Sequence, residues 1–174
     1  MEKVKGLTAT SSIIAISGGL AESAANTFTQ EQVDLQLNPL DNEVFAVTAI
    51  DLNLTPPEYD GSVSTAVFGS LSTTTRTTIG TIASSSVLAE ARDSIQVDEV
   101  SPTPNGVAFS RMSGETPAAD LPYLAIIATN DFFAQVQGAN NTAAKGMNFR
   151  VWGYRARASA SQYAALVQSE ILSQ

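Results

Sequence analysis

The stretch VFAVTAIDLNL, residues 44–54, decides how the chain is interpreted. Its large apolar residues alternate with polar or small ones, first on odd and then on even positions (Phe45, Val47 and Ala49, then Ile50, Leu52 and Leu54). A period of two is typical of a β-strand. The change of parity predicts a β-bulge, or a strand that crosses from one buried surface to another.

Segments of similar length follow one another along the chain, and Pro, Gly and Asn turn signals separate them. We expect further strands at residues 33–37, 63–71, 73–82, 95–100, 107–112, 123–129, 132–137 and 147–157. Segment 123–129 is a continuous apolar run, which is typical of a strand buried on both faces. Between strands, Ser113 to Pro122 is expected to form a surface loop.

Two helices are expected. The first is short and runs from Ser84 to Arg92, with serines for a cap and apolar residues at helical spacing. The second begins at the Ser-x-x-Gln capping box of residues 159–162 and carries one apolar stripe, Tyr163, Leu166, Val167 and Ile171. Because this helix is too short to be stable alone, it must pack on the rest of the domain or on a neighbour.

About eight or nine short strands with almost no helix predict an all-β protein, an antiparallel β-sandwich. We expect a jelly roll of about eight strands rather than an immunoglobulin sandwich, because the chain has no cysteine and its one tryptophan, Trp152, lies in the final strand. Three parts are expected: an extended N-terminal arm (1–28), the jelly roll (29–158) and the short C-terminal helix (159–174).

The N-terminal arm is rich in Ser, Gly and Ala. Its apolar run from Ile13 to Ile16 is too short for a signal peptide, so we expect no removed leader here. Since the arm has little apolar surface with which to dock on its own domain, we expect it to lie against a neighbouring subunit.

The composition excludes several classes of chemistry. The 174 residues include no His and no Cys, so a Ser-His-Asp triad, a cysteine nucleophile, a disulfide and a thiolate zinc site are impossible. No apolar run approaches the length of a membrane-spanning helix. We expect no enzymatic activity, no cofactor and no bound metal.

Carboxylates could still supply a glycosidase pair, either Asp41 with Glu43 or Asp98 with Glu99. Both pairs lie where turns favour Asx residues, so a structural role is the stronger interpretation. The oxygen ligands for a calcium ion are also present, but no D-x-D-x-D-G loop gathers them (Asp41, Glu43, Asp51 and Asp131). Trp152 and Tyr154 share one strand face and could form a sugar platform, although a place in the core or in a subunit contact is favoured.

Charge is unevenly placed along the chain, whose net charge is −8. From Gly6 to Thr75 there are eight acids and no base, whereas Lys145 to Arg157 carries four bases and no acid. This balance argues against binding to nucleic acid. The basic stretch is either a solvated strand face, an intramolecular partner of the acidic half, or a contact with a neighbouring subunit. For the subunit contact, the candidate residues are Lys145, Arg150, Arg155, Arg157, Leu166 and Ile171.

Two stretches, NPLDNEVF (38–45) and VWGYRA (151–156), together with the Ser- and Ala-rich arm, resemble the single jelly-roll capsid proteins of small tailless icosahedral viruses, including marine ones. The resemblance covers Thr29 to Gln174 and includes no catalytic motif. It implies a structural virion protein, a self-assembling capsid shell subunit located in the virion.

The partners that this resemblance implies are copies of the chain itself and other virion proteins. Direct binding to nucleic acid would be weak, because the arm carries only Lys3 and Lys5. Two alternatives stay open: another virion or cell-surface assembly subunit (tail tube, spike, decoration or filament), and a carbohydrate-binding β-sandwich module.

Overall fold

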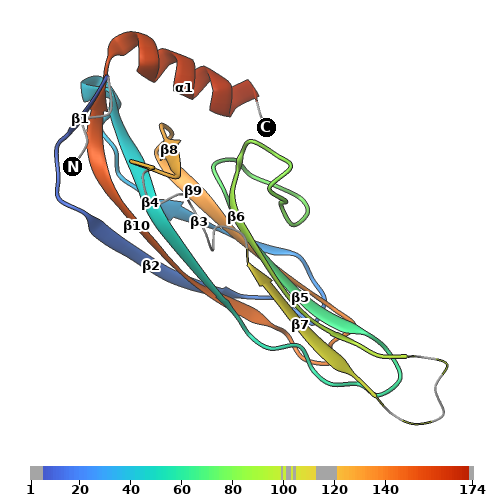
Figure 1. Ribbon diagram of the computed structural model, residues 1–174. Coiled ribbons are helices and arrows are strands. Elements are labelled where there is room, and N and C mark those ends of the chain that lie inside the picture. The colour runs from blue at the N-terminus through green and yellow to red at the C-terminus, as the bar shows by residue number, and fades with distance from the viewer. Residues whose placement is uncertain (1–5, 99, 101–102, 104, 113–120, 173–174) are drawn as a thin grey trace.

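The computed structural model describes residues 6–98, 100, 103, 105–112 and 121–172. In this part of the chain ten strands form two antiparallel sheets of five strands each, and one α-helix follows the last strand. Figure 1 shows an elongated sandwich, with the helix lying across one end. The expected all-β sandwich with a C-terminal helix is confirmed.

The first sheet is built around its longest strand, β10. Its order is β1-β10-β4-β8, and β2 pairs with β10 on the same side as β1. The bounds of these strands are β1 (Leu7–Ala9), β2 (Ile14–Ala21), β4 (Glu43–Leu54), β8 (Ala125–Ile127) and β10 (Gly146–Ala158).

The second sheet has the order β3-β9-β5-β6-β7. Its strands are β3 (Thr29–Asp34), β5 (Thr65–Ser72), β6 (Val87–Gln96), β7 (Val107–Met112) and β9 (Asp131–Ala139). A single 3₁₀ turn, η1 (Pro39–Asp41), precedes β4 and is capped by the Asn38 side chain.

The two halves of the chain run antiparallel to each other, which is the winding of a jelly roll. β2 pairs with β10, β3 with β9, β4 with β8, and β5 with β6, so each early strand finds its partner in the reversed order of the late strands. These antiparallel pairs belong alternately to the first and the second sheet, so that each sheet receives four of the eight strands. β1 pairs with β10 beyond the end of β2 and so lengthens the edge that β2 forms. β7 adds a fifth strand to the second sheet.

The main core fills the space between the sheets. Phe132 and Phe149 meet edge to face, with ring centroids 5.9 Å apart. They are surrounded by fully buried aliphatic and aromatic side chains from both sheets, including Phe45, Val47, Val67, Leu71, Ile127, Val136 and Val151.

A β-bulge in β4 explains the change of parity in residues 44–54. Ala49 is opposite Trp152 but Val47 is opposite Gly153, so Thr48 is the extra residue. Its hydroxyl donates to the Trp152 carbonyl at 3.1 Å. A Cβ at Gly153 would lie 2.5 Å from the Ala46 carbonyl oxygen, so only glycine fits beside the bulge. The predicted bulge is confirmed.

The helix α1 (Ala160–Leu172) covers the outer face of the first sheet at one end, where it forms a second apolar cluster. Tyr163, Leu166 and Val167 pack there against Tyr154 and small side chains of β4 and β10. At the start of the helix the Ser159 hydroxyl accepts from the Gln162 amide at 3.4 Å, as the capping-box pattern predicted. Near its end the buried Glu170 carboxylate accepts the Ala128 and Thr129 amides, each at 2.9 Å.

Two predictions for residues 73–92 are wrong. Ser84 to Arg92 does not form a helix, because Val87–Gln96 is strand β6 between β5 and β7. Ala89 and Ala91 face the core while Glu90 and Arg92 face outward, so pairing on both sides overrides the local helical spacing. Residues 73–82 form a loop instead of a strand, and its backbone bonds to side chains, for example Gly80 N–H to Ser70 Oγ at 3.0 Å.

The prediction that residues 1–28 form an arm on a neighbour is wrong for the described part. β1 and β2 pair with β10 of the same chain, β2 over eight consecutive partners from Ile14 to Ala21. Backbone hydrogen bonds therefore hold a segment whose side chains offer little apolar surface, although Leu20 is buried and Ile16 packs on the core. Residues 1–5 and most of the expected loop 113–122 lie outside the described residues.

The packing of α1 gives a matched pair of substitutions. Leu166 is half-buried against the sheet, whereas Ile171 is 57% exposed. Leu166→Ala should lower the free energy of unfolding by about 1–2 kcal/mol, less than for a fully buried leucine. Ile171→Ala should change it by less than about 0.5 kcal/mol. Urea unfolding followed by circular dichroism measures both, and equal losses would contradict this account of how the helix packs.

Candidate functional site

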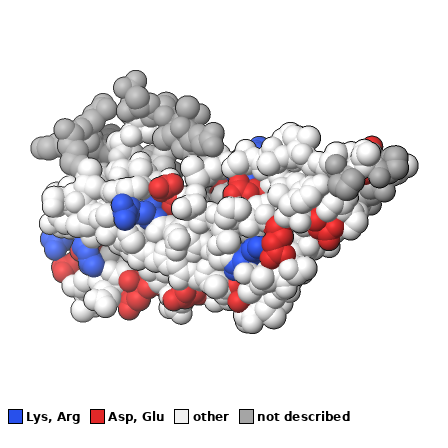
Figure 2. Space-filling model, turned by 90° about the horizontal axis from the view of Figure 1, so that it is seen from below, with Lys and Arg blue, Asp and Glu red and all other residues white. Residues whose placement is uncertain are grey.

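The basic stretch 145–157 pairs with acids of the same chain. Lys145 Nζ lies 2.9 Å from Glu58 Oε1, Arg155 Nη1 lies 3.1 Å from Glu43 Oε2, and an ion pair of 3.1 Å joins Arg157 Nη2 to Asp41 Oδ1. All three acids belong to the acidic half of the sequence. On the face presented in Figure 2, the larger groups of Lys and Arg side chains lie beside Asp and Glu side chains, and most of the surface is uncharged. Of the interpretations left open, intramolecular pairing is the one observed for these three bases.

Arg155 ties the two sheets together at one end of the sandwich. Its Nη2 donates to the Leu35 carbonyl at 2.7 Å, and its Nη1 donates to the Gln36 carbonyl at 3.0 Å and to Glu43. Leu35 and Gln36 directly follow β3 of the second sheet, whereas Arg155 lies on β10 of the first. The planar guanidinium can serve these acceptors at once, which a lysine ammonium at this position cannot do in the same geometry.

Polar side chains, of which Glu22 and Lys145 are buried, join the loops at the opposite end of β10. The Glu22 carboxylate accepts the Gly138 amide at 2.6 Å and the Lys145 amide at 2.8 Å. Glu58 accepts from the Thr142 hydroxyl and amide, from the Ala143 amide and from Lys145 Nζ. These bonds, the Thr142 hydroxyl first and the Lys145 ammonium next, lower the pKa of Glu58 from 4.5 to about 2.

The other candidate contact residues lie on or near the outer face of the first sheet. Arg150 donates to Ser17 Oγ at 3.0 Å and stacks over Trp152, 5.8 Å from the ring centroid. Tyr154 is buried under α1, so Trp152 and Tyr154 do not form a joint exposed sugar platform. Leu166 packs on the sheet and Ile171 faces solvent.

Four of the carboxylates nominated for catalysis or calcium serve other partners. Asp41 and Glu43 pair with arginines, and Asp98 accepts the Val100 amide in a turn, while Glu99 lies outside the described residues. Asp131 accepts from Gln32 at 2.6 Å at the start of β9. Within the described ranges no group of three or more acidic side chains is arranged to hold a metal ion.

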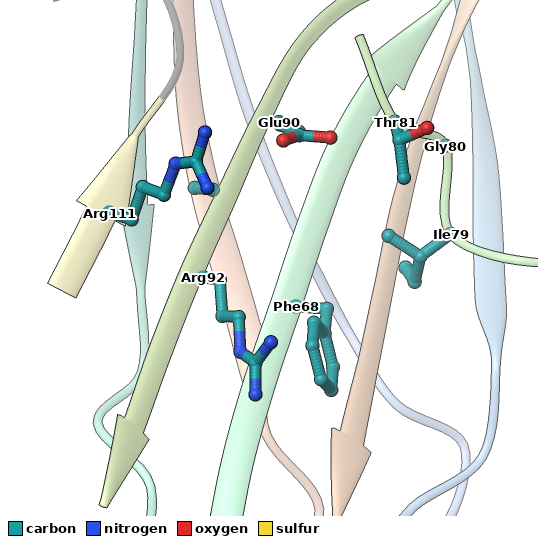
Figure 3. Close-up of a pocket in the computed structure, with 8 residues that line it drawn as sticks. Phe68, Ile79, Gly80, Thr81, Glu90, Arg92 and Arg111 are labelled. Carbon is teal, nitrogen blue, oxygen red and sulfur yellow. The ribbon is translucent and has the colours of Figure 1, made fainter. Parts of the chain in front are cut away.

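A pocket of about 180 Å³ lies on the outer face of the second sheet, beneath the loop that joins β5 to β6. In Figure 3 the Arg92 guanidinium points to the Phe68 ring, and the Glu90 carboxylate lies between the Arg111 side chain and the loop residue Thr81. Arg92 lies 5.0 Å from the Phe68 centroid and is the cross-strand partner of Arg111. The loop wall consists of Ile79, Gly80 and Thr81.

Sequence reasoning missed this pocket because residues 84–92 were assigned to a helix. The signal that could have been used is an alternation of period two in two segments. Glu90 and Arg92 share one strand face in the first segment, and Phe109 and Arg111 share one strand face in the second. The pairing of the two segments itself could not be derived from that pattern.

Within the described residues, both sheets end in strands that have one unpaired side. β2 forms one edge of the first sheet, and no described strand pairs with its outer side. β7 forms an edge of the second sheet, where Val107 and Phe109 are 59% and 57% exposed. Figure 1 places these two edges on different sides of the sandwich.

Comparisons with protein-family models, with curated proteins and with solved structures give no match for this chain. Among the described residues no helix has the length and apolar character needed to cross a membrane.

Glu58 should contribute a pH-dependent part of the stability. Its pKa is lowered on folding, so the contribution is present above the unfolded value of 4.5 and is lost as the pH falls toward 2. Glu58→Gln should therefore lower the urea midpoint most at about pH 6, and the difference from the wild type should shrink steadily to about pH 2. A difference that is constant across this range would show that Glu58 acts through packing alone.

Arg155 and Arg157 should differ sharply in their effect on stability. Arg155→Ala removes charge-assisted bonds to two backbone carbonyls and should cost about 1–3 kcal/mol, and Arg155→Lys should recover only part of this loss. Arg157→Ala breaks an exposed ion pair and should cost less than about 0.5 kcal/mol. Denaturant unfolding of the three variants is the measurement. Equal costs at the two positions would mean that the carbonyl bonds of Arg155 do not hold the sheets together.

Proposed function

We propose that this chain is a self-assembling structural subunit, a capsid shell protein of a virion whose main partners are its own copies. The jelly-roll winding supports the proposal, since viral shells are among the assemblies that use this architecture. The same architecture occurs in lectin domains and cupins, so fold alone does not decide between these functions. The observation that carries the proposal is the open edge formed by β2.

β2 has the properties of a strand that pairs with another chain. It is eight residues long, contains no charged residue and no proline, and most of its residues are exposed. Its inward side bonds to β10, which leaves a row of backbone donors and acceptors on its outward side. Monomeric proteins usually protect such edges with lysine, proline or a covering segment, and none of these protects β2 within the described residues.

The distribution of charge supports the same function. Because Lys145, Arg155 and Arg157 already pair within the chain, neighbouring subunits would meet through neutral and apolar surfaces. The exposed Val107 and Phe109 of β7 offer a second such surface at another edge. Two different edges on one subunit allow contacts that continue from copy to copy, as a closed shell requires.

Assembly can be tested on the full chain by light scattering after size exclusion and by negative-stain electron microscopy. We expect closed particles of uniform diameter. Ala15→Lys with Ala21→Lys places charge on the exposed β2 edge and should shift the protein to monomers or small oligomers while β-sheet circular dichroism is retained.

The matched control carries the same added charge elsewhere. Ala164→Lys with Ala165→Lys lies on the exposed face of α1 and should assemble like the wild type. A wild-type chain that stays monomeric at all concentrations and salt conditions would rule out a self-assembling subunit. Normal particles from the β2 variant would rule out this edge as the contact.

A further inference from the structure

Three arginines gather around the pocket on the outer face of the second sheet, in a chain with nine basic residues and a net charge of −8. Arg92 and Arg111 line it directly. Arg76 lies behind its wall, because a Cβ added at Gly80 would be 3.2 Å from Arg76 Nε. That Nε is buried and has no hydrogen-bond partner within the described residues. The pocket is therefore a local concentration of positive charge on an acidic protein.

Arg92 and Arg111 line the same pocket, and no ion pair within the described residues compensates their charge. They are direct partners across β6 and β7, an arrangement in which like charges are destabilising. Within the described part of the chain, neither guanidinium forms a salt bridge, whereas Lys145, Arg155 and Arg157 all do. Stacking on Phe68 fixes the plane of Arg92 and leaves its N–H groups available to an acceptor. An oxyanion in the pocket would offset their repulsion and could accept from their guanidinium groups.

The opposite wall of the pocket is fixed in place before any ligand arrives. The Gly80 amide donates to the buried Ser70 hydroxyl at 3.0 Å, and Ser70 in turn donates to the buried Gln135 at 2.8 Å. The Ile82 amide donates to Glu90 Oε2 at 3.0 Å. The loop therefore presents Ile79 and Thr81 to the pocket from an ordered backbone, which lowers the entropic cost of binding.

From this arrangement we infer that the pocket binds one acidic sugar residue through its carboxylate. Arg92 and Arg111 would hold the carboxylate, Glu90 and Thr81 would bond to ring hydroxyls, and Ile79 would contact the C–H face of the ring. The Glu90 carboxylate would repel a simple inorganic anion. A hydroxylated acid can accept hydrogen bonds from the arginines through its carboxylate and donate a hydroxyl hydrogen bond to Glu90. The volume of about 180 Å³ is below the usual range for drug-sized ligands and suits a single ring.

Saturation-transfer-difference NMR tests this inference on the full chain, because it works for monomers and for large particles alike. The result is thus independent of the proposed shell function. The probes observed directly are D-glucuronate, N-acetylneuraminate, D-glucose and acetate. Inorganic phosphate, which has no carbon-bound protons, is tested by its ability to displace the acidic sugar. We expect saturation of the ring protons of at least one of the two acidic sugars, at least about tenfold weaker binding of glucose, acetate and phosphate, and a loss of binding in high salt.

Arg150 provides a matched control, since it also stacks on an aromatic ring of an outer sheet face, but its cross-strand partners are Ser17 and Asp51 and it lines neither of the two described pockets. Arg92→Gln and Arg111→Gln should each weaken binding of the acidic sugar at least about tenfold, and Arg150→Gln should leave it unchanged. Absence of binding by both acidic sugars, equal binding of glucose, or equal binding of acetate or phosphate would overturn the inference. Retained binding in Arg92→Gln or Arg111→Gln would place the ligand elsewhere on the molecule.

Discussion

The pairing of β4 with β10 is the interaction on which the other elements depend. The two strands run together from Met147 opposite Leu54 to Arg157 opposite Glu43. Their inner faces supply much of the core, and at one end their outer faces supply the apolar surface that α1 covers. The bulge at Thr48 keeps apolar residues of β4 directed into the core on both sides of it. Without this pair, β1, β2, β8 and α1 would have no surface on which to form.

The same pairing decides how charge is distributed. By placing Arg155 and Arg157 near the start of β4, it brings them to Glu43 and Asp41, so these bases are neutralised within the chain. Arg92 and Arg111 occupy the other sheet, where the described residues offer them no comparable partner. The first sheet thus presents mainly neutral edges, and the second presents a small region of unbalanced positive charge. This difference is the basis of the two proposals, assembly through one surface and recognition of a ligand at the other.

Long strands with a strict period of two could be predicted from sequence, and short or exposed segments could not. Residues 44–54 and 147–157 reveal their strands and even the bulge, because one face of each is continuously apolar. β6 was not predicted as a strand, because Val87, Leu88 and Ala91 also fit helical spacing. Only the pairing with β5 and β7 favours a strand over a helix. β1 and β2 were not predicted as strands, because backbone pairing, rather than side-chain burial, holds them to β10. The pocket depends on the pairing of Arg92 with Arg111, a long-range register that no local pattern contains.

The pairing of β2 with β10 also determines when the molecule can fold. Among the described strands, residues 14–21 pair with residues 146–153, so β2 cannot join its sheet until β10 has been synthesised. Such high contact order places folding in the range of roughly milliseconds to seconds, because loop closure must precede the contacts that stabilise it. Throughout synthesis β2 is an uncharged segment with both edges open, a state prone to premature association between nascent chains. Chaperone capacity and translation rate should therefore limit the yield of folded chain more strongly than its final stability does.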